Sequence, residues 1–170
     1  MSFWIKLITL QNAGGQLGKL ATILLLFVLF SIIIFLGGSF HREQVVKAIE
    51  NRFSVHESGQ ILEFTDGGCP WKEHFFELEK KMKLENSDKQ VLYSIFPDSS
   101  GSWRIQSVPL SSHSFDLRRA LPDQWRGLRD KALDEMCGID GCIFIHASGF
   151  IGGHTTREGA LELGKKALTM

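Results

Sequence analysis

The sequence predicts an α/β fold, a mixed sheet with covering helices, preceded by a hydrophobic N-terminal helix. Three observations lead to this prediction. Uncharged apolar residues are concentrated near the N-terminus, short β-rich runs alternate with stretches of helical periodicity after residue 40, and turn-forming clusters separate these runs. The chain has 170 residues, which is enough for one domain of ordinary size. We therefore expect a hydrophobic leader at 1–40 and a folded body at 41–170.

Composition narrows the class of protein. Hydrophobic residues make up 44% of the chain, and 19 basic residues balance 19 acidic ones. Zero net charge argues against broad electrostatic binding to nucleic acid, although it permits a local basic patch. Three cysteines are too few, and odd in number, for a disulfide framework. The composition thus excludes a disordered tail, a collagen-like fibre and a disulfide-stabilised miniprotein.

The leader contains an uncharged run at 20–40 that is dominated by leucine, isoleucine and phenylalanine. As a helix this run is about 31 Å long, sufficient for a bilayer core of about 30 Å. We therefore predict a single transmembrane helix at about 20–38, with the membrane as its partner. Three other interpretations remain open: a cleaved secretory signal, a buried helix, and an artefact of gene assembly. Basic residues lie on both sides of the run, so they do not set its orientation.

The first half of the body is predicted to be a helix, a strand and a second helix. Apolar residues at helical spacing predict a short amphipathic helix at 41–52, and a β-rich run predicts a strand at 60–64. Pro70 precedes a stretch with apolar residues at intervals of three to four, which predicts a helix at 71–84. Trp71 is expected to anchor that helix to the sheet.

A hairpin and a helix are predicted next. Two β-rich runs at 91–96 and 103–108 are separated by the turn sequence PDSSGS, and this arrangement predicts a β-hairpin. Helical periodicity then predicts a helix at about 125–136, which Gly138 ends.

The last part of the chain is predicted to be a strand, a loop and a helix. The apolar run CIFIH predicts a short buried strand at 142–146. The sequence SGFIGGH that follows is expected to form a glycine-rich loop. Thr155 or Thr156 is expected to cap a final helix.

Three segments together resemble one protein family: CPWKEHFFELE (69–79), WRIQSVP with LPDQWRGLRD (within 103–130), and GIDGCIFIHASGFIGGHTTREGALELGKKAL (138–168). From about residue 42 to 168 the chain is similar to the C-terminal half of the Myg (melanocyte proliferating gene) exonuclease family, also labelled metal-dependent protein hydrolase. The resemblance implies a two-lobed DHH-like phosphoesterase that acts as a 3′–5′ RNA exonuclease with manganese or magnesium. It also implies a nuclear, cytoplasmic and mitochondrial location. In this superfamily the N-terminal lobe holds the metal ligands, and the C-terminal substrate-binding lobe presents a glycine-rich loop to the substrate.

The sequence departs from the family pattern in its first part. It contains no Asp-His-His and no His-x-Asp motif, and a two-metal hydrolase needs several carboxylates and imidazoles that converge on its ions. We therefore assign the chain no catalytic residue and no metal ligand. The resemblance implies a truncated or alternative form that keeps the substrate-binding lobe and is inactive without a catalytic lobe. The alternative is a membrane-anchored, non-catalytic binding or structural protein.

Candidate substrate-binding residues lie first in the glycine-rich segment before the final helix. Glycines allow a ligand to approach the backbone, and a helix N-terminus offers free N–H groups to a phosphate. Combined with the resemblance, this predicts that Gly152, Gly153, His154 and Thr155 contact phosphate, with His154 as a donor. A plain turn is the alternative interpretation. His146, at the end of the apolar strand, is either a functional group in a cleft or a structural histidine.

A second candidate group surrounds Trp125. Together with Arg126 and Arg129 it combines an aromatic plane with guanidinium groups, and Arg104 on the hairpin could join them. Single-stranded RNA is bound by such combinations through base stacking and phosphate contacts. The alternative is a core tryptophan with both arginines on an exposed helix face. The expected partners are single-stranded RNA or a nucleotide, and a separate catalytic lobe or a second copy of the chain.

The cysteines do not predict a metal site. Cys137 and Cys142 are too far apart in sequence for a paired cysteine motif, and a structural zinc site needs four ligands. Buried thiols are therefore expected at both positions.

Overall fold

The computed structural model describes residues 16–68, 70–84 and 90–170, and the side chains of 16–18 and 33–39 are not among those described. The chain divides into two compact units, Met1–Phe40 and His41–Met170. Each unit is described by itself below.

In the first unit, the described residues belong to α2 (Gln16–Val55). Large apolar side chains are exposed along this part of the helix, among them Leu20, Ile23, Leu24, Phe27 and Phe30. Within the described part of the chain, no helix is long and apolar enough to cross a membrane. The transmembrane helix predicted at about 20–38 is therefore not supported, and its side chains from 33 onward lie outside those described.

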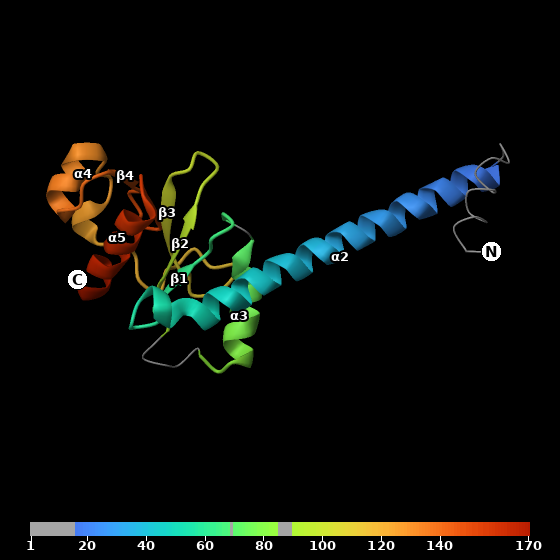
Figure 1. The fold of residues 1–170 in the computed structure, drawn as a ribbon, viewed down its shortest axis with the longest axis horizontal. Helices are drawn as coiled ribbons and strands as arrows, with labels where there is room; N and C mark the ends of the chain where they lie inside the picture. Colours follow the sequence, from blue (N-terminus) through green and yellow to red (C-terminus); the bar gives the residue numbers. More distant parts are fainter. Residues whose placement is uncertain (1–15, 69, 85–89) are drawn as a thin grey trace. The chain divides into compact units, whose positions relative to one another are not determined.

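The second unit is built on a five-stranded mixed sheet with the strand order β1-β2-β3-β5-β4 (Figure 1). Strand β1 (Ile61–Glu63) is parallel to β2 (Tyr93–Pro97), which forms an antiparallel hairpin with β3 (Trp103–Ser107). Strand β5 (Ile151–His154) lies between β3 and β4 (Cys142–Ile145) and is antiparallel to both. The predicted fold class and the predicted hairpin are confirmed.

One face of the sheet packs against α5 (Arg157–Thr169), which contacts β2, β3 and β5. Side chains of this helix join strand residues in the larger apolar core, which includes Ile61, Ile95, Ile105, Ala160 and Leu163. Beside β4 lie α4 (Asp130–Cys137) and a single 3-10 turn, η1 (Asp123–Trp125).

A second core lies on the opposite face, because neighbouring residues of a strand point to opposite sides. Ile61 belongs to the first core, whereas Leu62 belongs to the second. This second core is closed by α3 (Trp71–Lys81) and by residues 41–55 of α2. Trp71 is buried there, as predicted for an anchor of the helix to the sheet.

The glycine-rich segment is not a loop throughout, because its second half forms β5. Both glycines of that strand are buried between neighbouring strands. A Cβ atom on Gly152 would overlap with Ile145 and lie 3.0 Å from the carbonyl oxygen of Phe144. The absence of side chains thus lets β5 fit into the sheet, and sequence patterns based on apolar residues do not reveal such a strand.

The predicted helix at about 125–136 begins later, at Asp130. Its first residues take other conformations: Arg126 is extended, and Gly127 has a φ of 77°. The N–H of Gly127 donates to the carbonyl oxygen of Ile145, so this segment is tied to β4 instead of continuing as a helix. The helix ends at Cys137 with Gly138 as a left-handed cap, as predicted.

Candidate nucleic-acid interface

Three strands bring Arg104, Gly153 and Phe144 into one row across the sheet, on the face opposite α5. Arg104 on β3 pairs with Gly153 on β5, and Gly153 pairs in turn with Phe144 on β4. The next residues along these strands, Ile105 and Ile145, point into the core beneath α5. Arg104 and Phe144 are half-buried, so this row reaches the surface.

Gly153 makes the row possible because it has no side chain. A Cβ atom there would overlap with Nη1 of Arg104 and lie 3.0 Å from Cε1 of Phe144. The guanidinium of Arg104 instead crosses β5 and lies over the ring of Phe144, with Cζ 5.3 Å from the ring centroid. This distance is typical of a cation–π contact.

A second guanidinium contacts the same ring. Arg129 forms an isolated β-bridge with Phe144, and its Cζ lies 5.7 Å from the ring centroid. We call Arg104, Phe144 and Arg129 the aromatic–arginine site.

The two arginines of this site differ in their electrostatic surroundings. Arg104 forms an ion pair with Asp98. Hydrogen bonds from Ser100, with a contribution from the charge of Arg104, hold the pKa of Asp98 below its ordinary value. No carboxylate in the described part of the chain pairs with Arg129, which is exposed. The site therefore has one neutralised and one uncompensated positive charge.

His154 does not point toward this site but lies buried on the other face, with 2% of its surface exposed. Its Nδ1 accepts from the backbone N–H of Thr156 at 2.9 Å, and Nε2 lies 2.9 Å from the carbonyl oxygen of Asp140. Because Nδ1 accepts, the proton of the neutral ring lies on Nε2 and is donated to that carbonyl. Neither nitrogen is left for a phosphate, so the donor role predicted for His154 does not hold in this structure.

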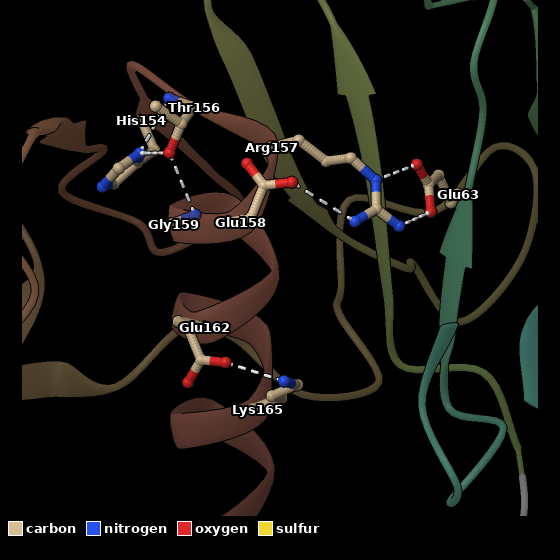
Figure 2. A network of polar contacts seen from close by, with 8 residues as sticks. All are labelled: Glu63, His154, Thr156, Arg157, Glu158, Gly159, Glu162 and Lys165. Carbon is tan, nitrogen blue, oxygen red and sulfur yellow. Dashed lines mark hydrogen bonds and ion pairs between the residues drawn. The ribbon is translucent and has the colours of Figure 1, made fainter. Parts of the chain in front are cut away.

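The start of α5 is likewise occupied by groups of the chain itself (Figure 2). The side chain of Thr156 accepts from the N–H of Gly159 at 3.2 Å, which confirms the predicted cap. The N–H of Thr155 donates to the carbonyl oxygen of Gly141. Gly152 faces Ile145 in the core. The four residues predicted to form an anion cradle at this helix start therefore do not converge on one site, and only Gly153 adjoins the aromatic–arginine site.

The ion pair between Glu63 and Arg157 fixes the same end of α5 to the sheet (Figure 2). Nε and Nη2 of Arg157 each donate to one oxygen of Glu63 at 2.5 Å. Glu63 ends β1 and Arg157 begins α5. Polar groups at this junction therefore stabilise the fold.

The second predicted group is also divided by the structure. Trp125 is 1% exposed and belongs to the larger core, so no face of its ring is open to a base, and the core alternative holds. Nε of Arg126 donates to the carbonyl oxygen of Leu121 at 2.8 Å, and its guanidinium pairs with Asp123. Of the residues in this group, Arg129 and Arg104 reach the aromatic–arginine site.

His146 is exposed at the start of the loop that follows β4. Its Nδ1 accepts from the backbone N–H of Ser148 at 3.2 Å, and its ring packs edge-to-face on Phe150 with a centroid distance of 4.7 Å. These contacts order the turn at 146–150. They do not join His146 to the aromatic–arginine site.

Comparison with known proteins identifies the family. Residues 38–168 match the sequence model of the MYG1 exonuclease family, described as an uncharacterised protein family (UPF0160). The chain belongs to the MYG1 exonuclease family. The resemblance noted in the three sequence segments is thereby confirmed.

Similar MYG1 proteins occur in distant eukaryotes. The chain is 52% identical over 127 residues to a MYG1 exonuclease of Mus musculus and 51% identical over 127 residues to one of Homo sapiens. It is 48% identical over 124 residues to a MYG1 protein of Saccharomyces cerevisiae. These alignments cover 75%, 75% and 73% of the chain but 33%, 33% and 36% of the relatives. The chain thus spans about a third of the length of these curated relatives. No solved structure matches it.

The divalent metal implied by the resemblance to the MYG1 family does not fit the residues described. Among them, no group of three or more His, Cys, Asp or Glu side chains could hold a metal ion. We therefore derive no catalytic step from these residues.

Phe144 is the residue of the aromatic–arginine site that sequence reasoning missed. It lies in the run CIFIH, which predicts a fully buried strand. A weak signal was present, since strict alternation places Phe144 on the opposite face from Ile145. The role of Gly153 as its neighbour depends on strand pairing, which no local pattern reveals.

Proposed function

We propose that this chain binds single-stranded RNA or a nucleotide, as the substrate-holding part of a MYG1-type exonuclease. The observation that carries the proposal is the placement of two guanidinium groups, Arg104 and Arg129, against one half-exposed ring, Phe144. The names of the mouse and human relatives, which are MYG1 exonucleases, support a nucleic acid as the ligand.

The chemistry of the site favours a single strand. An unpaired base stacks on an aromatic or guanidinium plane, and each stacked base contributes about 1–3 kcal/mol to binding. Arginine groups beside the ring attract the phosphates that flank the base. In duplex RNA the base faces are covered by their neighbours in the stack, so the ring of Phe144 has no free base to contact.

Hydrolysis requires more than this site. A two-metal phosphoesterase stabilises the attacking and leaving oxygens with its ions, and the described residues include no group that could hold one. We assign the cutting step to a separate catalytic lobe of a MYG1-type protein. The chain by itself then binds RNA without releasing nucleotides, in buffers with manganese or magnesium alike.

The test is fluorescence anisotropy of the full chain with a labelled single-stranded RNA and with the same sequence as a duplex. Phe144→Leu keeps an apolar side chain but removes the aromatic plane, and we expect it to weaken single-strand binding about tenfold. Phe150→Leu is the matched control, because Phe150 is an exposed ring that contacts His146. We expect that variant to bind as the wild type does.

Arg129→Gln separates charge from stacking in the same assay. Loss of one phosphate contact should lower the slope of log affinity against log salt by about one. Equal affinity for the single strand and the duplex, or equal losses in the two phenylalanine variants, would count against the proposal.

A further inference from the structure

Two thiols lie in contact beneath the edge of the sheet. Cys137 is the last residue of α4, and Cys142 is the first residue of β4. Their sulfur atoms are 3.5 Å apart, and the residues are 6% and 5% exposed. Both cysteines are free.

The backbone between the two thiols already has the shape of a closed turn. Gly138 and Gly141 both have positive φ angles, 66° and 94°, which turn the chain from the helix into the strand. The carbonyl oxygen of Ile139 lies 3.8 Å from Sγ of Cys137 and 3.3 Å from Sγ of Cys142. A disulfide has a sulfur–sulfur distance of about 2.05 Å, so the two sulfur atoms need to approach by roughly 1.5 Å.

We propose that Cys137 and Cys142 form a reversible disulfide when the chain meets hydrogen peroxide, and that this bond clamps α4 to β4. The two thiols are held together by the fold, so pairing requires no long-range closure of the chain. Peroxide is small enough to reach sulfur atoms that are almost covered.

The chemistry balances with one molecule of peroxide. The thiolate of one cysteine attacks a peroxide oxygen, an S–O bond forms as the O–O bond breaks, and hydroxide leaves and becomes water. The second sulfur then attacks the sulfenic acid, the S–S bond forms as the S–O bond breaks, and a second water leaves. Two thiols are oxidised by two electrons and peroxide is reduced. A dithiol reductant reverses the reaction by exchange.

The surroundings of the thiols affect the rate of this reaction. Burial, together with the neighbouring thiol of Cys137, raises the pKa of Cys142 above its ordinary value. The thiolate is the reacting form, so a thiol with a raised pKa reacts slowly. We therefore expect oxidation by peroxide to be slow, and the contact between the two sulfur atoms favours the disulfide once one of them is oxidised.

A disulfide here would stabilise more than the turn itself. The carbonyl oxygens of Asp140 and Gly141, within the turn, accept hydrogen bonds from His154, the last residue of β5, and from Thr155, which lies between β5 and α5. Nζ of Lys166 donates to the carbonyl oxygen of Cys137 at 2.6 Å. The cross-link thus fixes the point at which α4, β4 and α5 meet, and we expect the oxidised chain to unfold at a higher temperature.

The test uses the folded full chain with Cys69→Ser, which leaves only this pair of cysteines. After peroxide treatment the chain is denatured and its free thiols are alkylated with iodoacetamide. The chain is then digested with trypsin, and mass spectrometry measures the mass of the peptide 132–157, which contains both cysteines. We expect this peptide to lose two hydrogen atoms and to carry no alkyl group. Dithiothreitol should restore both alkylation sites, and Cys137→Ser should abolish both the mass loss and the rise in unfolding temperature.

Met136 provides an internal control in the same peptide, because its side chain is exposed and peroxide converts it to the sulfoxide. A peptide with oxidised Met136 and two alkylated cysteines would overturn the proposal, since peroxide would have oxidised the neighbouring residue without pairing the thiols. Conversion of either cysteine to a sulfinic acid with no disulfide would overturn it as well. These outcomes do not depend on RNA binding, so they leave the proposed function untouched.

Discussion

Arg118 holds Glu79 with two hydrogen bonds in a part of the body that is nearly closed to solvent. Nη1 donates to Oε1 at 2.8 Å and Nη2 to Oε2 at 2.5 Å, and the two side chains are 5% and 2% exposed. Nη1 also donates to the carbonyl oxygen of Val91, and the guanidinium lies over the rings of Phe75 and Phe76. The pair connects α3 to the segment that follows β3.

Glu79→Gln should destabilise the fold strongly. Removal of one charge leaves the guanidinium of Arg118 buried without its counter-ion, which costs about 3–5 kcal/mol in the free energy of unfolding. Glu77→Gln on the same helix is the matched control, because Glu77 pairs with Lys81 at the surface. Urea unfolding should show a far smaller loss for Glu77→Gln. Equal losses in the two variants would mean that the buried pair does not hold α3 in place.

This pair also shows why local patterns predicted the elements of the fold better than their contacts. The hairpin of β2 and β3 and the cap of α5 at Thr156 depend on residues that are close in sequence, and both were predicted. Arg118 and Glu79 are 39 residues apart. No sequence motif around either residue predicts that the two are in contact.

The candidate site was predicted in part for the same reason. Arg104 and Arg129 were named from the sequence, and Gly153 with the help of the family resemblance, but their meeting at Phe144 requires the order β3-β5-β4. Tryptophan is a residue type that often stacks on RNA bases. Only the burial of Trp125 shows that it belongs to the core. His154 was likewise named as a phosphate donor, whereas in the structure backbone groups contact both of its ring nitrogens.

Gly159→Ala tests the packing of His154 on α5. Alanine normally stabilises a helix interior relative to glycine by about 1 kcal/mol. Here a Cβ atom on Gly159 would overlap with the imidazole of His154, which is held on both sides. We expect the substitution to lower the free energy of unfolding by about 1–3 kcal/mol, measured by thermal or urea denaturation.

Gly164→Ala is the control for this effect in the same helix. A Cβ atom there would lie 3.0 Å from Cδ1 of Ile61, the end of a flexible side chain. Its cost should be smaller, and the double variant His154→Ala with Gly159→Ala should show a favourable coupling. Additive effects of these two substitutions would show that the ring is not what excludes a side chain at position 159.

Asp134 should make stability dependent on pH in the acidic range. Hydrogen bonds from the backbone, first from the N–H of Cys142 at 2.8 Å, lower the pKa of Asp134 in the folded chain. A depressed folded pKa adds stability that is fully present above the unfolded pKa of about 3.9 and is lost as the pH falls through the folded pKa.

Thermal unfolding between about pH 2 and about pH 6 measures this contribution. We expect Asp134→Asn to flatten the lower part of the stability curve relative to the wild type. Glu135→Gln, at an exposed position of the same helix, serves as the matched control. If the wild type and Asp134→Asn lose stability equally as the pH falls, the carboxylate of Asp134 does not cause the pH dependence.

The two glycines of β5 should respond differently to alanine, because they face opposite sides of the sheet. Gly152 lies under Ile145 and Ile105 in the core. Gly152→Ala should therefore overpack that core and cost about 1–3 kcal/mol in the free energy of unfolding. Its affinity for RNA, measured on the folded chain, should stay near that of the wild type.

Gly153→Ala should instead act on binding. The atom that a Cβ would meet first is Nη1 of Arg104, the end of a flexible side chain that can move away. The fold is expected to lose little stability, while the guanidinium of Arg104 leaves the ring of Phe144 and single-strand affinity falls by roughly three- to tenfold. If Gly153→Ala binds RNA as the wild type does while Phe144→Leu binds more weakly, Phe144 contributes to RNA binding and Arg104 does not. If Gly152→Ala instead loses affinity for RNA while its stability is unchanged, the RNA contact lies on the other face of β5.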